Sequence, residues 1–81
     1  MANPALPGAK AAPAHSQTLS RGIRMLEILS EESPLTIAEI SARMGVHRSI
    51  AYRILRTLED HGLVARDGAG GIVLGTGLAS L

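Results

Sequence analysis

The sequence of 81 residues lacks cysteine, phenylalanine and tryptophan, and Tyr52 is its single tyrosine. Without cysteine the chain has no disulfide and no thiolate metal site, which fits a reducing cytoplasm. Without large aromatic side chains other than that tyrosine, the hydrophobic core has to be built from Leu, Ile, Val, Met and Ala. A chain of this length forms one domain at most, and so small a domain is only marginally stable alone.

Charge and hydropathy exclude further classes of protein. The formal net charge is +1, from eight Lys or Arg against seven Asp or Glu, so the chain is not strongly basic. A nucleic-acid interface therefore depends on where the cations lie. No apolar run approaches the ~18 residues of a membrane span, and the N-terminus does not read as a signal peptide.

The first residues are rich in Ala and Pro, with Pro4, Pro7 and Pro13 among them. Proline interrupts helical and sheet hydrogen bonding, and this stretch offers few large apolar side chains to bury. We therefore expect residues 1–16 to form a disordered arm and residues 17–75 to form the folded domain.

From residue 18 onward, apolar side chains recur at helical spacing and predict a first helix over roughly 18–31. The stripe expected to face the core is Leu19, Ile23, Leu26 and Leu29, widened by Met25 and Ile28. Pro34 limits this helix, because the residue before a proline disfavours helical geometry. Leu35 follows as a candidate for a very short strand.

Thr36 and Glu39 match a capping box, in which each side chain accepts a hydrogen bond from the backbone N–H of the other residue. They predict a second helix, which ends where Gly45 supplies a left-handed residue. One face of that helix carries Ile37, Ile40, Ser41 and Met44. Val46 is expected to bury in the turn that follows.

A third helix is predicted from about residue 47 to residue 61, and Gly62 supplies its stop signal. At about 100° per residue, one narrow face collects the apolar residues Ala51, Ile54, Leu55 and Leu58. The opposite face carries Ser49, Arg53 and Arg56, with Tyr52 at its edge. Arg48, Arg53 and Arg56 lie within nine residues, so a nearly neutral chain presents a locally basic surface.

Beyond Gly62 the apolar period changes towards two, and residues 63–66 and 72–74 predict a β-hairpin around the glycine-rich loop 67–71. Residues 76–81 are expected to start a linker helix. The order of elements predicts a mainly α fold with a small β-hairpin (α+β). It is that of a winged helix-turn-helix, with three helices and a two- or three-stranded wing. The helix-turn-helix unit spans residues 36–55, and such a unit places its second helix in the major groove of DNA.

The sequence resembles the N-terminal domain of IclR-type transcriptional regulators over residues 18–81, about four-fifths of the chain. The resemblance rests on SRGIRMLEILSEESPLTIAEISARMGV, on RSIAYRILRTLEDHGLVARD and on the closing VLG. It implies a cytoplasmic repressor or activator that binds a palindromic double-stranded operator as a homodimer. It also implies that an effector small molecule acts through a C-terminal domain outside this chain, which would make the chain a fragment of a longer regulator.

The DNA contacts are expected on the helix-turn-helix unit and the wing. The candidate DNA-binding residues are Thr36, His47, Arg48, Ser49, Ile50, Tyr52, Arg53, Arg56 and Arg66. Arginine can donate two hydrogen bonds to guanine, and the free backbone N–H groups near Ser49 favour a phosphate. Second interpretations stay open for His47 as a helix cap, Tyr52 as packing beside the second helix or the wing, and Ile50 as core. His61 is expected to complement the helix dipole.

The wing tip departs from the family, because Gly68-Ala69-Gly70-Gly71 stands where a basic or polar tip followed by an aromatic residue is usual. The bare tip and the low net charge favour an alternative function, a winged-helix module that binds proteins and not DNA. An enzyme is not expected, since no Cys–His or Ser–His–Asp arrangement has usable spacing. The scattered histidines lack metal-ligand spacing, and no metal, cofactor or membrane partner is expected.

Overall fold

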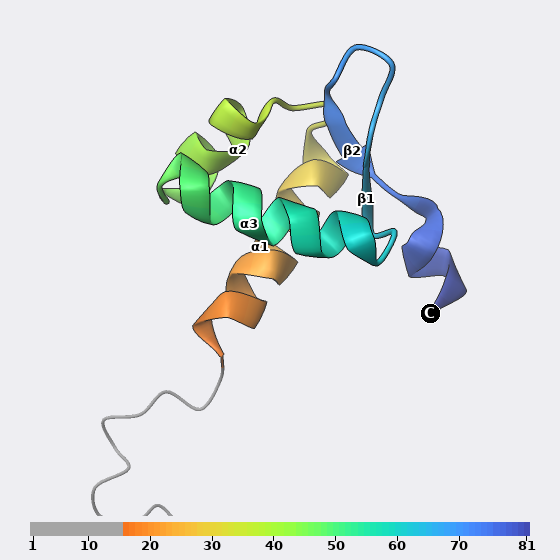
Figure 1. The fold of residues 1–81 in the computed structure, drawn as a ribbon, viewed down its shortest axis with the longest axis horizontal. Helices are drawn as coiled ribbons and strands as arrows, with labels where there is room; N and C mark the ends of the chain where they lie inside the picture. Colours follow the sequence, from red (N-terminus) through yellow and green to blue (C-terminus); the bar gives the residue numbers. More distant parts are fainter. Residues whose placement is uncertain (1–15) are drawn as a thin grey trace, which may run out of the picture.

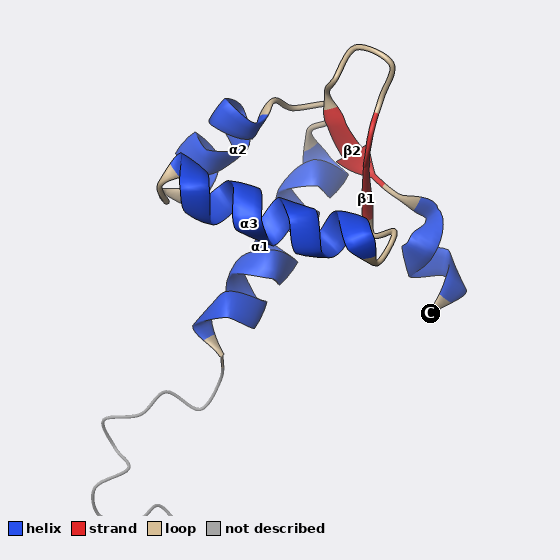
Figure 2. Cartoon of the chain, viewed as in Figure 1, coloured by secondary structure: helices blue, strands red, loops and turns tan. Residues whose placement is uncertain are grey.

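The computed structural model describes residues 16–81, so the predicted N-terminal arm, apart from Ser16, lies outside the described residues. Three helices come first, and a hairpin and a 3-10 helix follow (Figure 1). The elements are α1 (Gln17–Glu31), α2 (Ile37–Met44), α3 (Arg48–Asp60), β1 (Val64–Arg66), β2 (Ile72–Leu74) and η2 (Thr76–Ser80). The helices and the antiparallel two-stranded sheet confirm the predicted fold class (Figure 2).

The hydrophobic core lies where the helices meet the hairpin. Its largest fully buried side chains are Met25 and Leu29 of α1, Ile40 of α2, Leu55 of α3 and Val64 of β1. Burying such a side chain is worth about 1.5–3 kcal/mol relative to leaving it exposed. Because α1, α2, α3 and the hairpin each supply part of one core, they depend on one another for stability.

The first turns of α1 lie outside this core. Ser16 caps the helix, since its hydroxyl oxygen accepts a hydrogen bond from the backbone N–H of Leu19 at 3.2 Å. Leu19 is 64% exposed and Ile23 is 49% exposed, so the prediction that both belong to the core-facing stripe is wrong. The buried face consists of Gly22, Met25, Ile28 and Leu29. Helical spacing defines a face, but only turns that pack closely against a neighbour bury it, and a groove lies between the start of α1 and α3.

The capping box at the start of α2 is confirmed. The Thr36 hydroxyl accepts from the backbone N–H of Glu39 at 3.1 Å, and the Glu39 carboxylate accepts from the backbone N–H of Thr36 at 2.9 Å. Two of the N–H groups that a helix start leaves without partners are satisfied in this way.

The wing is short, with Val64 paired to Leu74 and Arg66 paired to Ile72. Asp67 anchors its loop. One carboxylate oxygen of Asp67 accepts hydrogen bonds from the backbone N–H groups of Ala69 at 2.9 Å and of Gly71 at 2.7 Å. These bonds give the glycine-rich loop an internal anchor, of the kind that an Asp side chain forms with backbone N–H groups in a turn.

Leu35 joins the segment between α1 and α2 to the wing. Its backbone N–H donates to the carbonyl of Ile72 at 3.1 Å, and the N–H of Ile72 donates back to the Leu35 carbonyl at 2.7 Å. Both side chains are buried in the core. The predicted short strand at Leu35 is therefore confirmed as a single bridge position.

After β2 the chain continues into η2, so the helical signal near the end of the sequence corresponds to a 3-10 helix. Its Leu78 is 42% exposed, and Leu81, which follows it, is 93% exposed. That residues 76–81 start a linker helix stays a prediction. Within residues 16–81, no helix is long and apolar enough to cross a membrane.

Candidate nucleic-acid interface

A tight turn between α2 and α3 positions the candidate interface. Gly45 ends α2 with a φ of +69°, which glycine adopts without steric cost. The N–H of Val46 then donates to the Ser41 carbonyl at 3.1 Å, and the Val46 side chain packs against the core. Both features agree with the sequence prediction, and α3 starts immediately after the turn (Figure 1).

The two sides of α3 differ sharply in burial. Its inner face consists of Ala51, Ile54 and Leu55, which are buried, and of Leu58, which packs against the core half-buried. Its exposed side chains include Arg48, Ser49, Tyr52, Arg53 and Arg56. The predicted phase of the helix is therefore confirmed, and these arginine side chains lie at the surface rather than in the core.

His47 forms the N-cap of α3. Its Nδ1 accepts a hydrogen bond from the backbone N–H of Ser49 at 3.2 Å and lies 3.1 Å from the Ser49 hydroxyl oxygen. The structure shows the cap, while a phosphate contact by the exposed His47 side chain stays a prediction. It also corrects one expectation, because the backbone N–H of Ser49 is occupied and is not free for a phosphate.

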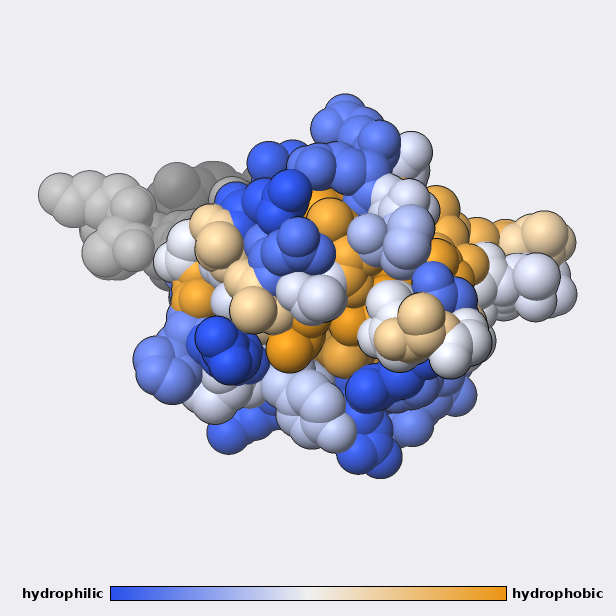
Figure 3. Space-filling view, turned by 90° about the horizontal axis from the view of Figure 1, so that it is seen from above, coloured by the Kyte–Doolittle hydropathy of each residue, from blue (hydrophilic) through white to orange (hydrophobic). Residues whose placement is uncertain are grey.

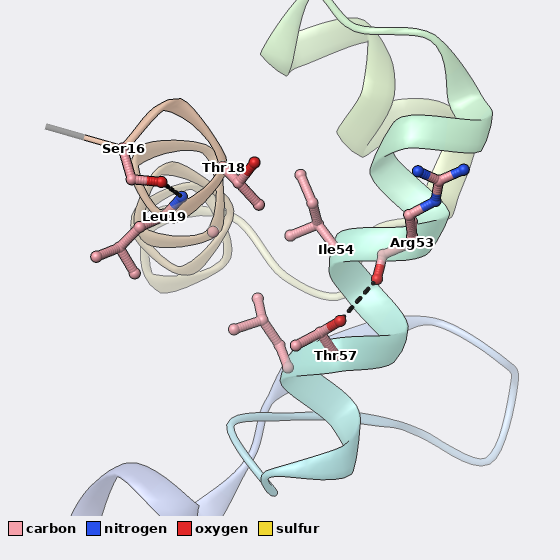
Figure 4. A pocket seen from close by; sticks show the side chains of 8 residues that line it. Ser16, Thr18, Leu19, Arg53, Ile54 and Thr57 are labelled. Atoms are coloured by element: carbon pink, nitrogen blue, oxygen red, sulfur yellow. Dashed lines mark hydrogen bonds between the residues drawn. The ribbon is translucent and has the colours of Figure 1, made fainter. Parts of the chain in front are cut away.

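Arg48 and Arg53 lie on the exposed side of α3 near its start and middle. Among residues 16–81, neither guanidinium takes part in an ion pair or a side-chain hydrogen bond. The backbone carbonyl of Arg53 accepts from the Thr57 hydroxyl at 3.1 Å, while its guanidinium points away from Leu19 across the helix (Figure 4). Both arginines can therefore donate to a ligand without breaking a contact within the described residues.

A second group of side chains connects the end of α3 to the wing. Glu59 accepts a hydrogen bond from Nε of Arg66 at 3.2 Å, and its other carboxylate oxygen lies 3.9 Å from Nε of Arg56. Arg56 donates to the Tyr52 hydroxyl at 3.5 Å, and the Arg66 guanidinium lies over the Tyr52 ring, 6.0 Å from its centre. Tyr52 therefore packs beside the wing, one of the two interpretations of this residue.

The positive charges beside Tyr52 change its acidity. The hydrogen bond from Arg56 and then the nearby guanidinium of Arg66 lower the pKa of the Tyr52 phenol below its ordinary value. Tyr52 is still 43% exposed, so part of the residue remains accessible to a ligand. Sequence reasoning missed Glu59 as a member of this group. The spacing of three between Arg56 and Glu59 was a usable signal, whereas Arg66 depends on where the hairpin lies.

Two further candidates have contacts inside the protein. Ile50 is partly buried and packs against the core, as its second interpretation proposed. The Thr36 hydroxyl is used in the capping box, although the side chain is exposed. The predicted role of His61 at the end of α3 is compatible with the 3.0 Å contact between its Nδ1 and the Thr57 carbonyl.

A groove separates the start of α1 from the middle of α3 (Figure 4). It has a volume of about 360 Å³, and Leu19, Gly22, Ile54 and Leu58 supply its apolar lining, with Arg53 at its edge. The view from above also shows hydrophobic residues at the surface, surrounded by hydrophilic ones (Figure 3). So small a domain leaves part of its apolar surface uncovered.

The arrangement of α2, the turn, α3 and the hairpin defines a winged helix-turn-helix domain. Residues 18–68 match the family model of the IclR helix-turn-helix domain, and the chain belongs to this family. It is 45% identical over 56 residues to an HTH-type transcriptional regulator of Mycobacterium tuberculosis, a match that covers 68% of this chain. A crystal structure of an IclR transcriptional regulator from Alicyclobacillus acidocaldarius superposes with a TM-score of 0.75 at 30% identity, covering 82% of this chain.

These relatives are much longer than the chain. The match covers 22% of the Mycobacterium protein and 28% of the Alicyclobacillus chain. The similarity therefore concerns the helix-turn-helix domain, and it does not extend to the remainder of either relative.

Proposed function

We propose that this domain reads double-stranded DNA for a transcriptional regulator, with α3 in the major groove. The observation that carries the proposal is the pair Arg48 and Arg53, exposed and unpaired within the described residues on a helix whose other side is fixed in the core. The major groove, roughly 12 Å wide, admits one α-helix. The family to which the chain belongs supports the same function.

The candidate residues divide into two roles in this proposal. Arg53, Ser49 and Tyr52 reach base edges, Arg56 reaches the DNA backbone, and Ile50 offers an apolar contact to a thymine methyl group. Arg48, His47 and Thr36 contact phosphates and fix the orientation of the domain on the duplex. Arg66 adds a contact from the wing to the DNA backbone. The glycine-rich tip of the wing carries no positively charged side chain.

The regulator as a whole is proposed from its relatives. We expect a cytoplasmic repressor or activator that binds a palindromic operator as a homodimer and responds to a small effector through a further domain. We expect two chains to bind each operator duplex. The molar mass of the complex in solution measures this ratio. One chain per duplex at saturation would contradict the dimer.

The test of DNA binding starts with a duplex selected by the chain from a random library. Arg53→Ala should weaken binding to that duplex by roughly 5- to 150-fold, the equivalent of losing one bidentate base contact. Arg24→Ala is the matched control, because it removes the same charge from α1, where Arg24 pairs with Glu27 at 3.8 Å. Equal affinities of the two variants would show that α3 does not read the operator.

The alternative function, association with a protein, is favoured by the apolar groove beside Leu19 and by the bare wing tip. A gel-shift titration at low salt separates the two functions. DNA binding should weaken steeply as salt increases, because neutralised phosphates release counterions. If no duplex is retarded at any salt concentration, the protein-binding function is the better interpretation.

A further inference from the structure

The arginines of the candidate interface fall into two groups. Arg48 and Arg53 are free of ion pairs within residues 16–81, whereas Arg56 and Arg66 both lie against Glu59. One carboxylate oxygen of Glu59 is 3.2 Å from Nε of Arg66, and the other is 3.9 Å from Nε of Arg56. A single carboxylate thus faces one guanidinium from the helix and one from the wing.

These ion pairs lie where a phosphate can reach them. The side chain of Glu59 is 31% exposed, that of Arg66 is 40% exposed and that of Arg56 is 56% exposed. Exposed pairs are weak, because water and salt screen them. A DNA phosphate offers the same guanidinium groups strong acceptor oxygens in charge-assisted hydrogen bonds. The carboxylate and a phosphate are therefore alternative partners for the same donors.

We propose, on the basis of the proposed function, that Glu59 occupies Arg56 and Arg66 in the free protein and releases them to the DNA backbone on binding. Breaking the two ion pairs opposes binding of any duplex. Glu59 thereby lowers the affinity of the domain for every duplex, whatever its base sequence. The choice between base sequences depends on residues that Glu59 does not contact, such as Arg53.

The first test replaces Glu59 by glutamine, which keeps the shape of the side chain and removes its charge. At about 50 mM salt, Glu59→Gln should bind a mixed-sequence duplex roughly tenfold more tightly than the wild type. The plot of log affinity against log salt should become steeper by roughly 1 to 2. Binding to the selected duplex should tighten by the same factor, because the competition does not involve bases.

Two control variants remove the same charge elsewhere. Glu27→Gln breaks the ion pair with Arg24 on α1, which has the same spacing as the pair between Arg56 and Glu59. Glu31→Gln removes a charge at the end of α1, from a residue that makes no ion pair within residues 16–81. Neither control should change the salt slope. If all three variants tighten binding equally, overall charge explains the effect and the proposal is overturned.

A second readout needs no DNA. Tyr52 is the only tyrosine and the chain has no tryptophan, so ultraviolet absorbance during an alkaline titration follows Tyr52 alone. Removing the charge of Glu59 should leave both guanidinium groups closer to the phenol and lower the pKa of Tyr52 further. The pKa should not change in Glu27→Gln. An unchanged pKa in Glu59→Gln would mean that Glu59 does not hold the two guanidinium groups in the free protein, which would overturn the competition.

The outcomes separate this inference from the function on which it rests. If the wild-type chain retards no duplex at low salt, DNA binding fails and the competition fails with it. If the wild type binds DNA while Glu59→Gln shows the same affinity and salt slope, only the competition is overturned.

Discussion

The inner and outer sides of α3 are built from the same 13 residues and are held in different ways. Ala51 and Leu55 on the inner side are fixed by neighbours from several elements of the core. Arg48 and Arg53 on the outer side have no side-chain contacts of the ion-pair or hydrogen-bond type within the described residues. The comparison shows that one helix can contribute to the core with one side and leave the side chains of the other side exposed.

The largest expected effect comes from the inner side. Leu55→Ala should lower the free energy of unfolding by roughly 2–5 kcal/mol, because the variant buries less apolar surface and leaves a cavity in the core. In a domain of this size each kcal/mol lowers Tm by roughly 4–8 °C. Thermal unfolding followed by circular dichroism measures the change. Arg53→Ala should melt like the wild type, and equal destabilisation of both variants would remove the distinction between the two sides.

A smaller effect sharpens the role of the outer side. Arg53→Lys keeps the charge and loses the planar fork that donates two hydrogen bonds to guanine. The ratio of affinities for the selected and mixed-sequence duplexes should fall by the equivalent of roughly 1–3 kcal/mol, with little change in the salt slope. Competition binding at two salt concentrations measures both quantities. An unchanged ratio would make Arg53 a phosphate contact.

A further expected effect concerns the contribution of the N-cap of α2 to stability. Thr36→Ala removes the acceptor for the backbone N–H of Glu39 and should cost roughly 0.5–2 kcal/mol of stability. Thr57→Ala is the control, since the Thr57 hydroxyl only bonds back to the Arg53 carbonyl within its own helix. Urea denaturation of the two variants gives the comparison, and a larger loss in Thr57→Ala would contradict the capping role.

The smallest expected effect concerns a surface ion pair away from α3. The hydrogen bond from Arg43 to Glu32, at 2.7 Å, lowers the pKa of the Glu32 carboxyl below its ordinary value of 4.5. A lowered pKa stabilises the folded state at neutral pH, and this contribution is lost as the pH falls through the lowered pKa. Glu32→Gln should therefore be slightly less stable than the wild type at neutral pH and equally stable in acid. A difference that grows in acid would contradict the assignment.

Features with a local signal were predictable from the sequence. Thr36 with Glu39, and Gly45 after the second helix, act within a few residues, so their pattern suffices to place both ends of α2. The inner face of α3 was also predictable, because three buried residues repeat at the period of the helix. The apolar stripe of α1 was placed only in part, since nothing in the sequence says that Leu19 stays largely exposed within residues 16–81.

In the candidate interface, exposure was predictable and contacts were not. The phase of α3 placed its arginines outward, but the occupation of the Ser49 N–H by His47 is a matter of side-chain direction. The meeting of Glu59 with Arg66 depends on how the hairpin returns against α3, which no spacing in the sequence fixes. The anchoring of the wing loop by Asp67 also needed the turn geometry.

The hydrogen bonds between Leu35 and Ile72 have a consequence for the proposed binding to DNA. They run in both directions between the backbone before α2 and the second strand of the wing. We therefore expect the base of the hairpin to move together with the helical part, so that the distance between α3 and the hairpin changes little. Under the proposed function, sites with a wider or narrower groove would be accommodated by bending or twisting of the duplex, and the stiffness of the DNA would then contribute to recognition.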